Sequence, residues 1–216
     1  MKRSRLFSLA LVSAVVIATQ SLPAMAATIT FDALPASGNP GTFVTGGFSF
    51  SGVDFVSFGS SFCGPQCPEN NTNYLLDQDI WTAGWSMSKS DGGSFSLLSF
   101  DGAEAHLGLP SIWAENILVT GTLSGGGTVS ATFALDFLQD GGGAGNDFQR
   151  FSLSSDFSDL VSVRFLGAGS GANWFSVDNI EVGSADSNAV PEPASLALLG
   201  LGLAGLGATR RKQKTA

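Results

Sequence analysis

Short runs in which hydrophobic and polar residues alternate recur along the middle of the chain. In Phe48-Ser49-Phe50-Ser51 the aromatic rings fall on one side of an extended backbone and the hydroxyl groups on the other, as in a half-buried strand. Similar runs end at clusters of Gly, Asp, Asn and Ser, which favour turns. No segment between Ala27 and Ser184 sustains the period of an α-helix. The pattern predicts an all-β domain of about eight to ten short strands.

The clearest pair of strands lies in the second half of the chain. Ile117–Leu123 and Val129–Leu135 flank Ser124-Gly125-Gly126-Gly127, which predicts a β-hairpin. The sequence also holds 17 Phe residues, and rings on the inner faces of two sheets can fill the ~10 Å between them. We therefore expect a two-sheet β-sandwich of jelly-roll type, with a closed barrel as the architectural alternative.

The N-terminal segment has a different pattern. Lys2, Arg3 and Arg5 precede an apolar run over residues 6–18, and Ala24-Met25-Ala26 forms a small-x-small cleavage site with Ala24 and Ala26 at its small positions. This order is typical of a secretory signal peptide, which we expect as a helix over residues 1–26. The Sec translocon and signal peptidase are then partners in export, and the mature chain begins at Ala27. A retained membrane helix is the alternative.

The C-terminal segment contains a second apolar run between a Pro-rich motif and a basic cluster. Pro191-Glu192-Pro193 precedes the small and apolar residues 194–208, and basic residues follow up to Lys214. As a helix, this run is about 22 Å long at ~1.5 Å per residue, shorter than the ~30 Å hydrocarbon core of a bilayer. The basic end should stay in the cytoplasm. We expect a short transmembrane helix in an inner-membrane intermediate, and a poor permanent anchor.

Motif, apolar run and basic end, in this order at the C-terminus, resemble the PEP-CTERM sorting signal of Gram-negative bacteria. The resemblance implies that exosortase, a membrane protease-transpeptidase, reads residues 190–214 and processes the chain at Pro191, Glu192 and Pro193. Passengers of this signal are often linked to exopolysaccharide, and they reach the cell surface or the extracellular matrix. An ordinary tail anchor is the alternative. Between the two signals we expect one β-sandwich domain over residues 27–183 and a polar spacer over residues 184–189.

Removing both signals changes the charge of the protein. Residues 27–190 hold only three basic residues, Lys89, Arg150 and Arg164, and seventeen acidic ones, a net charge of −14 compared with −8 for the whole chain. A domain with this charge repels phosphate backbones, which excludes nucleic acid as a partner. The charge favours divalent cations, neutral glycans or cationic partners.

Cys63 and Cys67 are the two cysteines, in Cys-Gly-Pro-Gln-Cys. In an exported protein an even, close pair predicts a disulfide, and free thiols are the alternative. The spacing has one residue too many for a thioredoxin-type redox motif.

Residues for catalysis are few. The chain has one His, His106, one Tyr, Tyr74, and neither the metalloprotease nor the serine-hydrolase motif. The many acids do not single out a glycosidase pair, because no spacing rule connects residues on different strands. We therefore predict no catalytic residues and no enzyme activity.

Calcium is the one cofactor that the sequence favours, because acidic Gly-rich loops supply hard oxygen ligands. The loop over residues 136–147 contains Asp140 and Asp147 and fits the start of a G-G-x-G-x-D calcium repeat once, with a simple hairpin loop as the alternative. Separately, the segment over residues 175–182 resembles the closing strand of jelly-roll carbohydrate-binding modules. That resemblance implies that Asp178, with Asp32 in the first strand, holds a structural Ca²⁺; an ordinary acid at a strand end is the alternative for each.

Tryptophan side chains are candidate glycan platforms, because the apolar faces of sugar rings stack on flat aromatic rings. Trp81 lies near acidic residues and Trp174 follows Asn173 in a Gly-rich stretch, so these two are the preferred candidates. Packing in the core is the alternative for each Trp, including Trp85 and Trp113.

Together these features predict an exported, non-catalytic protein of the cell surface or extracellular matrix that is associated with exopolysaccharide. A lectin-like glycan-binding module, stabilised by calcium, is one alternative. A polysaccharide hydrolase or lyase is the other.

Overall fold

The computed structural model describes residues 26–58, 68–78, 84–105, 110–137, 147–171 and 173–185. The predicted signal helix, the cysteine pair Cys63 and Cys67, Trp81, Asp140 and the whole sorting signal lie outside these residues. Within the described ranges, no helix has the length and apolarity needed to cross a membrane.

Extended strands make up almost all of the ordered secondary structure. In chain order they are β1 Ala27–Ile29, β2 Ser37–Gly38, β3 Phe43–Thr45, β4 Phe48–Ser51, β5 Phe55–Phe58, β6 Asn73–Asp77, β7 Trp85–Lys89, β8 Phe95–Glu104, β9 Asn116–Leu123, β10 Thr128–Ala134, β11 Gln149–Ser152, β12 Leu160–Ala168 and β13 Phe175–Ser184. Two short 3-10 turns, η2 Pro110–Ile112 and η3 Ser155–Phe157, interrupt them. The described part of the chain contains no α-helix, so the predicted all-β class is confirmed.

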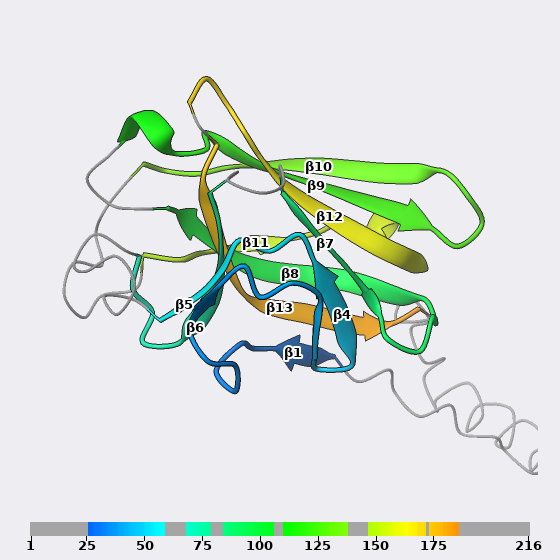
Figure 1. Cartoon of the computed structure of the whole chain (residues 1–216). Coiled ribbons are helices and arrows are strands. Elements are labelled where there is room, and N and C mark those ends of the chain that lie inside the picture. The colour runs from blue at the N-terminus through cyan, green and yellow to red at the C-terminus, as the bar shows by residue number, and fades with distance from the viewer. Residues whose placement is uncertain are drawn as a thin grey trace, which may run out of the picture.

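The thirteen strands form one antiparallel sheet with two arms (Figure 1). The β8 arm has the order β2-β5-β6-β13-β8, with β1 on β13 and β11 on β8. The β12 arm has the order β12-β7-β4-β3, with β9 on β12 and β10 on β9. A single residue pair, Leu160 with Phe95, joins the arms. Two independent sheets, as a β-sandwich requires, are therefore not confirmed.

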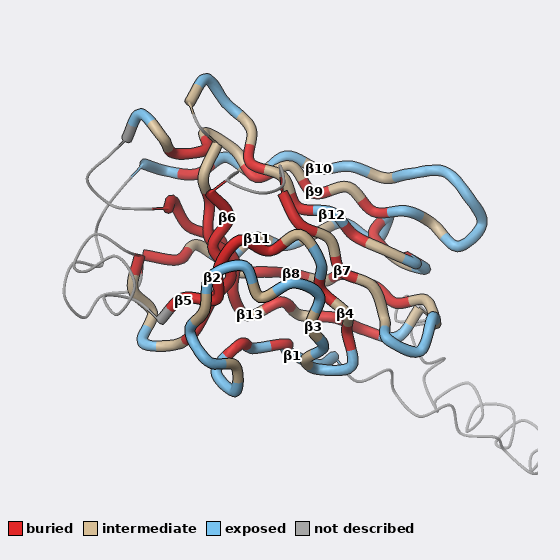
Figure 2. Tube along the Cα trace, in the orientation of Figure 1, coloured by how far each residue is buried: buried red, intermediate tan, exposed pale blue. Residues whose placement is uncertain are grey.

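The sheet curls so that aromatic rings from the two arms meet in the interior. The ring of Phe95 in β8 contacts that of Phe48 in β4 edge-to-face, with 4.9 Å between centroids. Phe100 in β8 contacts Phe165 in β12 in the same way at 5.2 Å, and Phe165 stacks on Trp85 of β7 at 4.3 Å. All five rings are buried, and Figure 2 shows the buried backbone between the arms. The Phe-rich composition thus fills a core between facing strands, as expected.

The predicted hairpin is present as β9 and β10. The two strands pair from Thr128 opposite Thr122 to Ala134 opposite Asn116. Gly126 and Gly127 adopt φ values of 90° and 89° in the connection, a backbone region that side chains disfavour. The three-glycine run therefore sets the position of the turn, and the turn sets the register of the strands.

Candidate functional site

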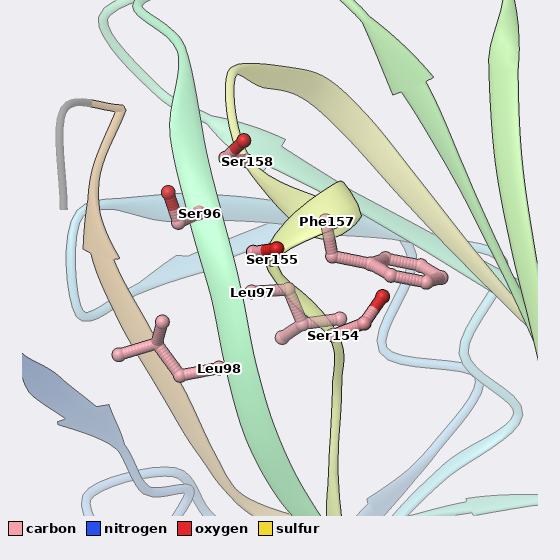
Figure 3. A pocket seen from close by; sticks show the side chains of 7 residues that line it. All are labelled: Ser96, Leu97, Leu98, Ser154, Ser155, Phe157 and Ser158. Atoms are coloured by element: carbon pink, nitrogen blue, oxygen red, sulfur yellow. The ribbon is translucent and has the colours of Figure 1, made fainter. Parts of the chain in front are cut away.

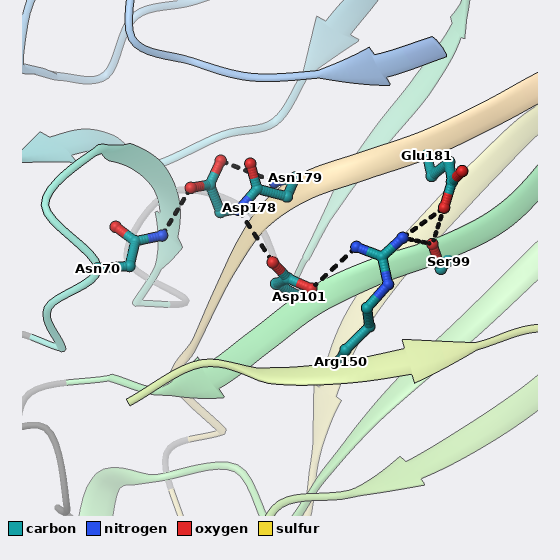
Figure 4. Close-up of polar contacts among 7 residues, drawn as sticks. All are labelled: Asn70, Ser99, Asp101, Arg150, Asp178, Asn179 and Glu181. Atoms are coloured by element: carbon teal, nitrogen blue, oxygen red, sulfur yellow. Dashed lines mark hydrogen bonds and ion pairs between the residues drawn. The ribbon is translucent and has the colours of Figure 1, made fainter. Parts of the chain in front are cut away.

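Three neighbouring strands of the β8 arm carry polar side chains on the face that points away from the core. Asp101 of β8 lies directly opposite Asp178 of β13 on one side and Arg150 of β11 on the other. Directly opposite residues share a face of the sheet. With Ser99, Asn179 and Glu181 they form the outer polar row, drawn in Figure 4.

Arg150 connects three strands at the exposed end of this row. Its Nη1 lies 3.5 Å from a carboxylate oxygen of Asp101, and its Nη2 donates to the carboxylate of Glu181. Nη2 also donates to the hydroxyl of Ser99 at 2.7 Å, and that hydroxyl donates to Glu181 at 2.8 Å. The Arg150 side chain remains 52% exposed. One cation therefore pairs with two carboxylates while part of its surface faces solvent.

A β-bulge in β13 continues the row toward Asp178. The register between β13 and β8 shifts after Asp178, and Asn179 adopts a positive φ of 47°. A bulge re-aims the side chains beside it. Here it lets the Asn179 amide donate to Asp101 at 2.9 Å, while the Asn179 backbone N–H donates to Asp178 at 2.7 Å.

Asp178 is fully buried at the inner end of the row. Its carboxylate accepts hydrogen bonds from the Asn70 amide at 2.7 Å and the Thr72 hydroxyl at 2.8 Å. Burial nevertheless raises the pKa of Asp178 from 3.8 to about 6, because desolvation outweighs these hydrogen bonds, and the charge of Asp32 adds to the effect.

Asp32 and Asp178, predicted to share a calcium ion, are brought close to the same segment of chain. Asp32 is exposed and accepts a hydrogen bond from the backbone N–H of Asn73 at 3.1 Å. The side-chain oxygen of Asn73 is buried and accepts no hydrogen bond from any described residue. Two carboxylates and an amide oxygen are suitable calcium ligands. Within the described ranges, however, no three or more acidic, His or Cys side chains group together as a metal site would require.

The other described calcium candidate, Asp147, has a structural partner. It is buried, its carboxylate accepts from the backbone N–H of Glu69 at 2.9 Å, and its own N–H donates to the Glu69 carbonyl at 3.1 Å. These two bonds tie the segment before β11 to the segment before β6. A calcium role for Asp147, with Asp140 outside the described residues, stays a prediction.

The described tryptophans differ in how far they are buried. Trp85 and Trp113 are 1% and 3% exposed, so they pack in the interior. Trp174 forms an isolated backbone bridge with Trp113 and is partly buried. Its ring packs against a second hydrophobic cluster on the outer face, made of Phe55, Tyr74, Leu76, Ala103, Ala105 and Phe148. A glycan would meet only part of the Trp174 ring, and its predicted binding role is untested.

Several residues of this region were not singled out by the sequence. In the sequence, Asp101, Arg150 and Glu181 stand out only by their charge. Arg150 is nevertheless one of just three basic residues in the folded domain. Glu104 at the end of β8 is also fully buried and accepts from the backbone N–H of Phe137 at 2.7 Å. Its burial raises its pKa above the ordinary value. A rare cation in an acidic domain is the sequence signal that could have found the row.

One depression in the described surface lies beside β8. Figure 3 shows a depression between β8 and η3, lined by Ser96, Leu97, Leu98, Ser154, Ser155, Phe157 and Ser158. Its volume of about 20 Å³ suits a single water molecule, whereas small-molecule sites usually measure about 300 Å³ or more.

The comparisons with known proteins bear on the C-terminal end of the chain, outside the described strands. A family model described as the PEP-CTERM protein-sorting motif matches residues 189–212. No curated protein matches the chain. The folded part is thus an all-β domain joined to a sorting signal. The chain carries a PEP-CTERM motif, which marks a protein exported through the membrane to the cell surface and processed by exosortase.

Replacing Arg150 tests whether the outer polar row holds β11 to the sheet. We expect Arg150→Met to lower the free energy of unfolding by about 1 kcal/mol, because Asp101 and Glu181 lose their shared cation. The loss should shrink in high salt, which already screens this pair. Urea unfolding at two salt concentrations measures both effects. Arg164→Met removes the same charge from β12, outside the row, as a comparison. A loss at Arg150 that is the same at both salt concentrations would contradict an ionic role for the row.

Proposed function

We propose that the folded domain is a non-catalytic component of the extracellular polysaccharide matrix. The observation that carries this proposal is the PEP-CTERM match at residues 189–212, which follows an acidic all-β domain. Exosortase acts on the sorting signal, and the β-rich domain remains as the working part at the cell surface. The inner-membrane form is an intermediate.

The chemistry of the outer polar row supports binding better than turnover. Glycosidases use one carboxyl group that is protonated and another that is ionised, on either side of an open cleft. Asp101 and Glu181 are both bonded to Arg150, and Asp178 is buried behind them. The described surface beside β8 offers a depression of about 20 Å³ lined largely by serines, with no acid in its lining.

A neutral, hydroxyl-rich polymer is the partner that fits the row. The exposed part of Arg150 and the partly exposed Glu181 offer a donor and an acceptor side by side on the outer face of the sheet. The net charge of −14 disfavours an acidic polymer unless a divalent cation bridges the two. The domain would therefore act in the matrix by binding the glycan itself.

Binding to the organism's own exopolysaccharide tests this proposal. Protein recovered from the cell surface should co-sediment with the polymer, and the double variant Arg150→Gln with Glu181→Gln should bind at least several-fold more weakly. The same pair of changes at Arg164 and Asp156, away from the row, is the control. Equal binding by all three proteins would contradict a role for the row, and release of reducing ends from the polymer would favour a hydrolase instead.

We further propose that calcium stabilises the domain at Asp32 and Asp178. The support is that both acids contact the same short segment, Asp32 through Asn73 and Asp178 through Asn70 and Thr72. The buried side-chain oxygen of Asn73 lacks a donor among the described residues. An ion there would offset the cost of burying the Asp178 charge.

We also propose that the curled sheet corresponds to a jelly-roll-like sandwich whose two layers touch at one corner. The support is that the arms share only the Leu160–Phe95 pair, while Phe rings from both arms pack against one another.

A further inference from the structure

The β12 arm ends in an edge strand that differs from the other edges of the sheet. β10 pairs only with β9 and is seven residues long. The other described edge strands, β1, β2, β3 and β11, have two to four residues. Figure 1 shows β10 running along the upper margin of the molecule, beside β9. A long edge strand is a template for pairing with another strand.

The hydrogen-bond pattern of the hairpin shows which backbone groups of β10 face outward. Just beyond the strand ends, Leu123 donates to the Gly127 carbonyl and Leu135 to the Glu115 carbonyl, each at 3.1 Å. Bonding alternates along an antiparallel pair, so the odd-numbered residues of β10 bond to β9. The N–H and C=O groups of Thr128, Ser130, Thr132 and Ala134 therefore point away from β9. No other described strand pairs with this edge.

The side chains of β10 are also incompletely covered. Val129, Ala131 and Phe133 pack against the core yet remain only half-buried, whereas Thr128, Ser130, Thr132 and Ala134 are exposed. Figure 2 shows the exposed colour along most of this strand. A further strand paired with β10 would bury more of these apolar side chains. β9 shows the effect, because it has a strand on each side and its Ile117 and Val119 are fully buried.

The hairpin carries no charge in an otherwise acidic domain. From Asn116 to Leu135 there is no acidic, basic or Pro residue, and the flanking acids are Glu115 and Asp136. Natural edge strands usually carry Lys, Pro or a bulge that prevents association. For two copies that each carry −14, an edge without charged residues also keeps the repulsion between acidic side chains low close to the contact.

We propose that two copies of this protein pair antiparallel through their β10 edges, with Ala131 opposite its own copy. In this register every outward-facing residue meets another outward-facing residue: Ser130 lies opposite Thr132 of the second copy, and Thr128 opposite Ala134. On the core side Val129 lies opposite Phe133. The hydroxyl groups of Ser130 and Thr132 thus meet, as those of Thr120 and Ser130 already do across the hairpin at 3.1 Å. The contact is two-fold symmetric and self-complementary.

Charge exchange between two variants tests both the pairing and its register. Ser130→Lys with Thr132→Lys places Lys opposite Lys across the two-fold axis, and Ser130→Glu with Thr132→Glu places Glu opposite Glu. Sedimentation of protein recovered from the cell surface, over a series of concentrations, should show dimers for the unchanged protein and monomers for each variant. An equimolar mixture of the two variants should form dimers again, because Lys then lies opposite Glu.

Two further variants keep the result independent of folding. Thr120→Lys with Thr122→Lys adds the same charge to the same face of β9, one strand inside, and should still dimerise. Thr132→Pro removes an outward-facing N–H and should be monomeric, with the unfolding midpoint that the unchanged protein has at concentrations where it is also monomeric. The proposal is overturned if the unchanged protein is monomeric at every concentration, or if Thr132→Pro dimerises as strongly as the unchanged protein. It is also overturned if the mixed Lys and Glu variants stay monomeric.

Discussion

Protein recovered from the cell surface should end close to Pro193, without the apolar run and the basic cluster. The run of residues 194–208 is too short and too rich in Gly to form a durable membrane anchor, and the sorting motif that a protease reads precedes it. Exosortase processing should therefore be close to complete. Intact-mass measurement of the surface protein gives the position of its C-terminus directly.

The matched control for this experiment changes the motif alone. With Pro191→Ala, Glu192→Gln and Pro193→Ala together, the chain should keep its C-terminal tail and stay in the membrane fraction. Pro110→Ala, in the folded domain, should leave processing unchanged. Recovery of peptides from residues 194–209 in mature surface protein would contradict processing at this motif.

Removing the charge of Asp178 should change the pH dependence of the domain's stability. The pKa of Asp178 is about 6 in the folded protein, compared with 3.8 for the ordinary group. Its contribution to stability is therefore complete below about pH 4 and is lost as the pH rises through 6. At 1.36 kcal/mol for each pH unit between the two values, the loss is about 3 kcal/mol. In calcium-free buffer, the free energy of unfolding of Asp178→Asn should not fall in this way as the pH rises.

Urea unfolding between pH 4 and 8 measures the difference between the two proteins. The free energy of unfolding of Asp178→Asn, relative to the unchanged protein, should rise by about 3 kcal/mol across this range. Asp156→Asn, at an exposed position in η3, is the control and should show no such rise. A constant difference between Asp178→Asn and the unchanged protein would show that the carboxyl group titrates alike in the folded and unfolded states.

Ionisation of the Asp178 carboxylate lowers the free energy of unfolding, and calcium binding to the ionised carboxylate should raise it. Because Ca²⁺ binds the ionised form, its addition at pH 8 should raise the unfolding midpoint of the unchanged protein by a few degrees and leave Asp178→Asn unmoved. Mg²⁺ prefers a stricter octahedral geometry and should do less. Equal shifts with Ca²⁺, Mg²⁺ and NaCl would leave only general screening of an acidic domain.

The parts of the fold that sequence could predict are those set by local pattern. The β9–β10 hairpin was predicted because period-two segments flank a run of glycines, and the buried rings of Phe48 and Phe50 follow from simple alternation. The outer polar row was not predicted, because it depends on the register between Asp101, Arg150 and Asp178. These residues come from strands far apart in the chain, and no local signal fixes which strands become neighbours.

The candidate site shows the same division. Resemblance to a closing strand drew attention to Asp178, but its burial depends on the Asn70 to Asn73 segment packed against it. The bulge at Asn179 follows from no simple rule for that residue, although Asn tolerates positive φ better than most. Sequence therefore identified the acid, and the three-dimensional structure supplied its environment.

The position of the last strand has a consequence for the order of events during export. β13 lies between β6 and β8 and also holds β1, so four strands from the beginning, middle and end of the domain meet only when the final strand is available. Such long-range pairings form slowly, because the loops that they close are long. During export through the membrane, the chain therefore lacks the centre of its β8 arm until residue 184 has crossed. We expect the sheet to be completed only on the far side of the membrane.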